Sequence, residues 1–206
     1  MSIKTLLLIL PALLLISEAS GQTPAIEYDL YQLNNKGRLT AVNRQVTSVD
    51  DGTRKSIRFS DTGEDGVCWI DGMDFSNGVI ELDIRGTDVF QRSFVGVAFH
   101  GKDEKTLDAV YFRPFNFLAA DSVRRIHAVQ YISHPDYPWN KLRTEQNGKY
   151  EKAIGQSLNP NDWFPVKIVV NYPTVSVYVN NSATPCLTVE KLNTNTSGKI
   201  GLWAGF

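Results

Sequence analysis

Gly78–Gly86 reads GVIELDIRG, and this stretch indicates the fold class of the chain most clearly. Isoleucine or leucine occupies positions 80, 82 and 84, and the residues between them are Glu81, Asp83 and Arg85. An alternation of period two sends apolar and charged side chains to opposite faces of an extended strand. The stretch therefore predicts a β-strand with one face in a core and one face in water.

The same alternation recurs along most of the chain, whereas long apolar stripes of helical period are scarce. It is found in the stretches Phe94–His100, Asp108–Phe115, Arg125–Ser133, Trp163–Val170 and Val175–Val179. Glycine, asparagine, aspartate and proline separate these runs, which is typical of strands joined by tight turns. The pattern predicts an all-β chain folded as an antiparallel β-sandwich of the jelly-roll type.

Two shorter segments complete this prediction. Asn171–Thr174 reads NYPT and is expected to form the turn of a hairpin. One short helix is expected around Asn140–Gln146. The strand-like run at the end, GKIGLWAGF, stops without a polar tail, so we expect that one closing strand of the sandwich is missing.

Residues 1–21 are interpreted as a signal peptide. Lys4 precedes an apolar run of eleven residues, Leu6–Ile16, and small residues follow at 19–21. A run of this length cannot cross roughly 30 Å of hydrocarbon, for which about 20 residues are needed. We expect a mature chain of one domain, 22–206, exported to the periplasm or the outside of the cell without a membrane span.

Composition excludes one class of partner. The chain has 21 Lys and Arg against 22 Asp and Glu, a net charge of −1, and no basic stripe. Nucleic-acid binding rests on neutralised phosphates, so we expect no nucleic-acid partner. Cys68 and Cys186 either pair in an oxidising compartment or act as small buried hydrophobic residues.

The stretch Tyr111–Glu151 is the expected recognition surface. It reads YFRPFNFLAADSVRRIHAVQYISHPDYPWNKLRTEQNGKYE and holds eight of the 22 aromatic residues together with four arginines. Rings stack on apolar faces, while guanidinium and imidazole groups bind hydroxyls and carboxylates. Saccharides suit such a surface best.

Six segments together resemble a known family. They read FSNGVIELDIRG, SFVGVAFHG, DAVYFRPFNF, HAVQYISHPDYPW, DWFPVKIVV and GKIGLWAGF. They are similar to the 3-keto-disaccharide hydrolase-like family, an exported bacterial group with the concanavalin A-like lectin/glucanase fold. The resemblance implies a jelly roll of two curved sheets, carbohydrate on the concave face and cleavage of 3-keto-glycosides.

Glu81 and Asp83 resemble the start of the motif of family 16 glycoside hydrolases. Retaining hydrolysis needs two carboxyl groups about 5–5.5 Å apart. The second carboxylate is absent here, because Arg85 and Gly86 stand where it should be, and an arginine cannot protonate a leaving group. We keep both acidic residues as substrate-binding candidates, with ion pairing along a polar strand face as the alternative.

His127 is the candidate catalytic residue, predicted in mid-strand on a polar face with Arg125 and Tyr131. It would act as a general base near neutral pH or ligate a divalent metal. The alternative is a histidine hydrogen-bonded to a neighbouring strand. No metal ligand set is evident, so cofactors stay open.

The remaining substrate-binding candidates lie on either side of this strand. Tyr111 and Arg113 share a face, and Arg113 either binds hydroxyls or bridges to Glu81 or Asp83. His134 and Trp139 flank a loop with two prolines, which would hold the ring of Trp139 ready for a sugar; alternatively the ring caps the core.

These features favour an exported β-sandwich that binds or acts on glycosides in a concave groove, including 3-keto-glycosides. A non-catalytic lectin-like domain and a structural or partner-binding module are the alternatives. Whether the chain is an enzyme stays open, because the usual pair of carboxylates is missing.

Overall fold

The computed structural model describes residues 25–205, so the expected signal peptide lies outside the described residues. The helical segments are α1 (Leu30–Asn35), η1 (Pro114–Asn116), α2 (Ser122–Arg125) and α3 (Trp139–Glu145). The strands are β1 (Leu39–Val42), β2 (Val46–Asp50), β3 (Lys55–Phe59), β4 (Gly66–Phe75), β5 (Gly78–Arg85), β6 (Phe94–Gly101), β7 (Leu107–Phe112), β8 (Val129–His134), β9 (Glu151–Lys152), β10 (Trp163–Asn171), β11 (Thr174–Val179), β12 (Leu187–Glu190) and β13 (Gly198–Gly205).

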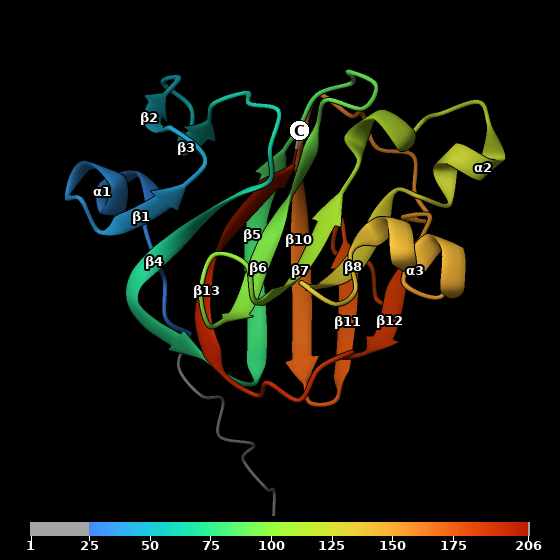
Figure 1. Cartoon of the computed structure of the whole chain (residues 1–206). Helices are drawn as coiled ribbons and strands as arrows, with labels where there is room; N and C mark the ends of the chain where they lie inside the picture. Colours follow the sequence, from blue (N-terminus) through green and yellow to red (C-terminus); the bar gives the residue numbers. More distant parts are fainter. Residues whose placement is uncertain (1–24, 206) are drawn as a thin grey trace, which may run out of the picture.

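Two antiparallel sheets face one another, as Figure 1 shows. The seven-stranded sheet has the order β1-β4-β13-β6-β7-β8-β9, and the four-stranded sheet has the order β12-β11-β10-β5. A separate hairpin consists of β2 and β3. The predicted all-β antiparallel sandwich of the jelly-roll, concanavalin A-like type is confirmed.

The period-two alternation of the sequence determines which residues of the four-stranded sheet face the core. Ile80, Leu82 and Ile84 of β5 turn toward the core, and the two acidic residues between them are exposed. The predicted hairpin also forms, with Asn171 opposite Thr174 where β10 turns into β11. On both of its strands every second residue is buried. Each fully buried apolar side chain contributes about 1.5–3 kcal/mol, which fixes this register.

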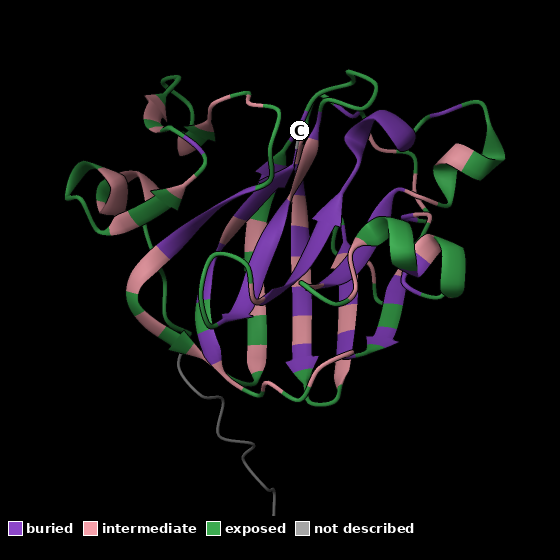
Figure 2. Ribbon diagram, viewed as in Figure 1, coloured by how far each residue is buried: buried purple, intermediate pink, exposed green. Residues whose placement is uncertain are grey.

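The centre of the seven-stranded sheet is buried on both faces, as the continuous buried colour of β7 in Figure 2 shows. On the inner face, Phe112 packs edge-on against Phe164 of the other sheet at 5.4 Å between ring centroids. On the opposite side, which we call the outer face, Tyr111 packs on Trp203 at 4.6 Å. The alternation in this strand therefore separates two packed layers, and Tyr111 does not lie on a solvated polar face.

The predicted strand Arg125–Ser133 is wrong in its first half. Residues Ser122–Arg125 form α2, and β8 begins only at Val129. The side chain of Asp121 accepts a hydrogen bond from the Val123 amide and caps this helical turn. His127 consequently lies in the connection between helix and strand. The predicted short helix around 140–146 is confirmed by α3.

The two cysteines are free thiols. Cys68 lies on β4, and Cys186, which directly precedes β12, donates its thiol to the carbonyl of Val177 at 3.3 Å. Burial raises the pKa of each thiol to about 11. Cys68 is buried and Cys186 is half-buried against the core, so both act as small apolar residues, and the alternative disulfide does not form.

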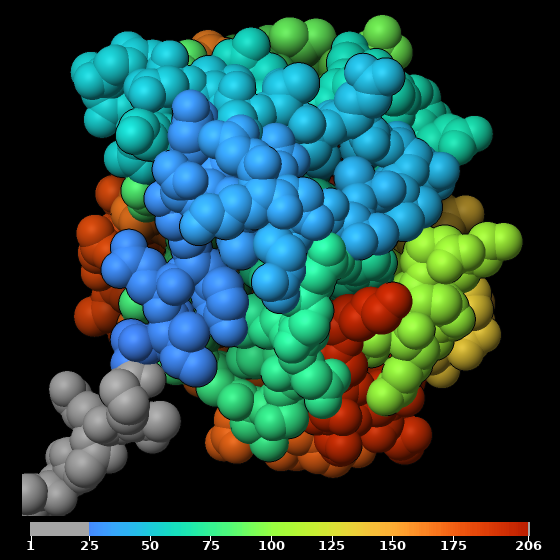
Figure 3. All heavy atoms as spheres, turned by 90° about the vertical axis from the view of Figure 1, so that its left-hand side faces the viewer, coloured from blue at the N-terminus to red at the C-terminus, as the bar shows by residue number. Residues whose placement is uncertain are grey.

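The segments before β4 cover the side of the sandwich at the β1 edge. Figure 3 shows their atoms, in blue to cyan, as one continuous layer on this side. Arg54, in the turn between β2 and β3, pairs with Asp83 of β5 and stacks over the ring of Trp163 at 4.9 Å. These contacts hold the hairpin against the four-stranded sheet. Within residues 25–205, no helix has the length and apolar character required to cross a membrane.

Candidate functional site

A buried carboxylate, Glu151 of β9, is the centre of the candidate site. Its side chain is 2% exposed, and three cationic or basic side chains converge on it. Arg143 of α3 binds both carboxylate oxygens, at 3.1 and 2.7 Å. Arg113, directly after β7, lies 3.8 Å from Oε2, and His127 lies on the same oxygen. Three separate segments, which contain residues 113, 127 and 143, therefore meet at one carboxyl group.

His127 Nδ1 lies 2.8 Å from Glu151 Oε2. The position of the ring is set by its backbone, because the His127 carbonyl accepts a hydrogen bond from Arg113 Nη1 at 2.9 Å. The side chain is 15% exposed, so part of the ring reaches the surface. Nδ1 lies close to the carboxylate without a hydrogen bond of ordinary geometry, and Nε2 is the ring nitrogen left to exchange a proton with a ligand.

The charges of the site are set by burial and by one another. Burial lowers the pKa of His127, although the Glu151 carboxylate acts in the opposite direction. Burial alone would raise the pKa of Glu151, but the hydrogen bonds and charge of Arg143, with His127 and Arg113, lower it. Near neutral pH the arrangement is a neutral imidazole against an ionised carboxylate. A neutral imidazole supported in this way can accept a proton.

Tyr111 and Arg113 form a buried hydrogen-bond network beside His127 and Glu151. The Tyr111 hydroxyl donates to Gln130 Oε1 at 3.0 Å, and Arg113 Nη2 donates to that hydroxyl at 2.7 Å. Burial raises the pKa of Tyr111 to about 12, so the phenol stays protonated. Both side chains are almost completely buried. They support His127 and Glu151 rather than reaching a ligand, and Arg113 does not bridge to Glu81 or Asp83.

Trp139 extends the site to the surface. It is the first residue of α3, it is 43% exposed, and the guanidinium of Arg143 lies over its ring at 5.0 Å. The same guanidinium binds Glu151, so one arginine connects an exposed ring with the buried carboxylate. We call Trp139, Arg143, Glu151 and His127 the His127 face.

Glu81 and Asp83 lie elsewhere, on the outer side of the four-stranded sheet. There they line an open hollow of about 360 Å³ together with Lys167 and Tyr178. Asp83 pairs with Arg54, and Arg85 donates to the carbonyl of Asn161 at 2.8 Å. The two acidic substrate-binding candidates therefore do not share a site with His127. Ion pairing was the alternative for this strand face, and Asp83 does pair, but with Arg54 from another segment.

The other three predicted binding residues are also dispersed. Arg125 donates to the carbonyls of residues 119 and 120 and closes the loop before α2. Tyr131 points to the inner face, where its hydroxyl donates to Asp108. Its separation from His127 follows from the helical turn that replaces the expected strand start. His134 ends β8 opposite Leu107, and burial lowers its pKa.

Sequence reasoning missed Glu151, Gln130 and the role of Arg143. Glu151 lies on a strand of two residues, which is too short to show an alternation. A signal for Gln130 existed, because an uncharged polar residue stands between the apolar residues of AVQYI. Its side chain faces Tyr111 across the β7–β8 pair. Within residues 25–205, no group of three or more His, Cys, Asp or Glu side chains is placed to hold a metal ion.

Solved structures are similar to this chain in fold. The carbohydrate-binding module CBM66 from Bacillus subtilis superimposes with a TM-score of 0.55 at 18% identity, over 82% of this chain and 91% of that one. A Bacillus subtilis protein of unknown function with a galectin-like fold gives 0.53 at 12% identity, over 84% of both chains. A search of curated proteins finds no significant match.

The sequence itself carries the assignment to a family. Residues 28–205, nearly the whole described part, match the family described as the 3-keto-alpha-glucoside-1,2-lyase-like domain. The match begins just before α1 and ends at β13, so it includes both sheets and the His127 face. The chain belongs to the 3-keto-alpha-glucoside-1,2-lyase-like domain family.

Proposed function

We propose that this chain is an exported domain that binds glycosides at the His127 face and cleaves 3-keto-glycosides with His127 as the base. The observation that carries the proposal is the 2.8 Å contact between His127 Nδ1 and Glu151 Oε2, with Glu151 held by Arg143. The family membership supports the substrate class. No pair of catalytic carboxylates is required.

The chemistry follows from the ketone. A carbonyl at C3 acidifies the neighbouring C2–H, and a neutral imidazole can remove this proton through Nε2. The imidazolium that forms is stabilised by the Glu151 carboxylate at Nδ1. Loss of the leaving group from C1 then gives an unsaturated keto sugar, and the proton returns to the departing oxygen. His127 is thus both the base and the source of the proton.

Binding is assigned to the exposed ring of Trp139. The pyranose presents a face of C–H groups, which stacks on an indole. Arg143 already lies over the indole at 5.0 Å and holds α3 to the site through Glu151. The ring is therefore presented in a fixed orientation, which lowers the entropic cost of binding.

Turnover of a 3-keto-glucoside by the purified chain, followed by release of the leaving group, tests the proposal. We expect His127→Gln to lower kcat at least about a hundredfold, the usual size of a general-base contribution. Trp139→Ala should raise KM with a smaller effect on kcat. His134→Gln is the matched control, because His134 lies at the far end of β8, and it should retain wild-type rates.

The alternative is a binding module without chemistry, which the exposed Trp139 also supports. If saccharides raise the melting temperature of the wild type but no 3-keto-glucoside is turned over, the catalytic part of the proposal is wrong. If Trp139→Ala also leaves that shift unchanged, the assignment of the binding surface is wrong as well.

A further inference from the structure

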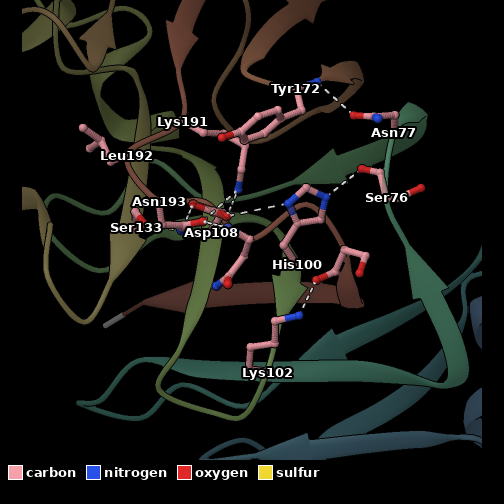
Figure 4. A network of polar contacts seen from close by, with 12 residues as sticks. Ser76, Asn77, His100, Lys102, Asp108, Ser133, Tyr172, Lys191, Leu192 and Asn193 are labelled. Atoms are coloured by element: carbon pink, nitrogen blue, oxygen red, sulfur yellow. Dashed lines mark hydrogen bonds and ion pairs between the residues drawn. The ribbon is translucent and has the colours of Figure 1, made fainter.

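A second polar cluster lies between the two sheets, and it is separate from the His127 face. Figure 4 shows Asp108 of β7 surrounded by Lys191, His100 and Asn193. The side chains of Asp108 and Lys191 are both 0% exposed and are in direct contact. Lys191 directly follows β12, so the pair joins the seven-stranded sheet to the four-stranded sheet.

We propose that Lys191 and Asp108 form an intramolecular isopeptide bond in the folded protein. This modification goes beyond the proposed function and does not depend on it. The pair has the three features that such a bond requires: contact between amine and carboxyl group, exclusion of water, and hydrogen-bond donors on the carbonyl oxygen.

The donors lie on Asp108 Oδ1. The Tyr131 hydroxyl donates to it, and Asn193 Nδ2 donates at 2.9 Å. A backbone amide, that of Leu192, donates in turn to the Tyr131 hydroxyl at 3.3 Å, which polarises it further. Two donors on one carboxyl oxygen stabilise the negative charge that develops there when a nucleophile attacks the carbon.

The other carboxyl oxygen, Oδ2, is the one that leaves as water when the bond forms. It contacts Lys191 Nζ, and His100 Nδ1 faces it at 3.9 Å. Burial lowers the pKa of Lys191, which favours the neutral amine, the nucleophilic form of this group.

The reaction balances without a co-reactant. The lone pair of Nζ forms a bond to Cγ of Asp108, Oδ1 carries the negative charge, and Oδ2 leaves with two protons as water. The remaining Nζ–H keeps Asn193 Oδ1, now 3.3 Å from Nζ, as its acceptor. The product keeps the donors on Oδ1, and it removes two buried charges, which are costly in a medium of low dielectric constant.

Intact mass spectrometry of the denatured wild-type chain, with peptide mapping after proteolysis, tests this bond. We expect a mass lower than the sequence requires by one water molecule, and one branched peptide containing both Asp108 and Lys191. Lys191→Met should restore the full mass. Lys102→Met, a change of a lysine that donates to the Ser197 carbonyl, is the control and should keep the loss.

Asp108→Asn gives a second, independent readout. If the amine attacks the asparagine amide, ammonia leaves and the product is the same cross-link, so the variant should reach the mass of the cross-linked wild type. A folded wild-type chain with the full mass and two linear peptides would overturn the proposal. It would show that the pair is an ion pair only.

Discussion

At the scale of single residues, the candidate site depends on how the buried charge of Glu151 is compensated. Glu151 is ionised inside the protein because Arg143 and Arg113 supply positive charge on two sides and His127 contacts the same oxygen. Removing one member of such a group leaves the others buried and unpaired, which costs more than the intact group contributes. The site should therefore be sensitive to changes that preserve shape and alter charge.

Glu151→Gln tests this sensitivity. The amide keeps the size of the side chain but cannot compensate the two guanidinium groups, so we expect a loss of about 3 kcal/mol in the free energy of unfolding. Chemical denaturation measures it. Glu145→Gln, the same change at an exposed position of α3, should stay within about 0.5 kcal/mol. Equal effects of both changes would contradict the central role of Glu151.

The three histidines predict a dependence of stability on pH. Burial lowers the pKa of His100, His127 and His134 in the folded chain. Between these lowered values and the ordinary value of about 6.5, the unfolded chain binds more protons than the folded chain. The free energy of unfolding should therefore be highest above pH 6.5 and fall as the pH decreases below it.

Thermal unfolding at a series of pH values measures this dependence. His127→Gln should reduce the loss of stability between pH 6.5 and 5, because one of the titrating groups is removed. A melting temperature that stays constant or rises as the pH falls through this range would contradict the argument.

At the scale of elements, the sequence predicted strands well wherever alternation coincided with a solvated face. The stretch around Glu81 shows this, since one face of β5 is exposed and the other lies in the core. The face of Tyr111 was misjudged because β7 is covered on both sides, which alternation alone does not report. The start of β8 was misjudged because the cap at Asp121 outweighs the alternating pattern after it.

Gly96 tests how closely the central strands pack. A Cβ atom at this position of β6 would lie 2.1 Å from the carbonyl oxygen of Val110 and 2.6 Å from Cα of Tyr111. Backbone atoms cannot move aside as the end of a flexible side chain can. Gly96→Ala should therefore lower the free energy of unfolding by about 3 kcal/mol. Gly63→Ala, where a Cβ would have nothing within 4 Å, is the control. Equal stability of the two variants would contradict the packing of this sheet.

At the scale of the whole molecule, pattern and family resemblance were sufficient for the architecture but not for the site. The sandwich follows from repeated alternation, a local property of the chain. The site requires Glu151, Arg143 and His127 to meet from three elements, and such proximity depends on strand order. For the same reason, the sequence could not show that Glu81, a substrate-binding candidate, lies on the other sheet from the His127 site.

Both cysteines are free, and the stability of the molecule should not depend on a disulfide. We expect the melting temperature to be unchanged by a reducing agent. A thiol reagent should react slowly with the native chain, because burial raises the pKa of both thiols to about 11, and should detect two thiols after denaturation. Denatured chain without reactive thiols would show that the cysteines pair.

We propose above all that glycosides bind at the His127 face. Titration of the isotope-labelled chain with a glucoside, followed by NMR, tests it directly. We expect the indole signal of Trp139 and the imidazole signals of His127 to shift with one binding curve. Shifts confined to Lys167 and Tyr178, in the hollow of the four-stranded sheet, would contradict it.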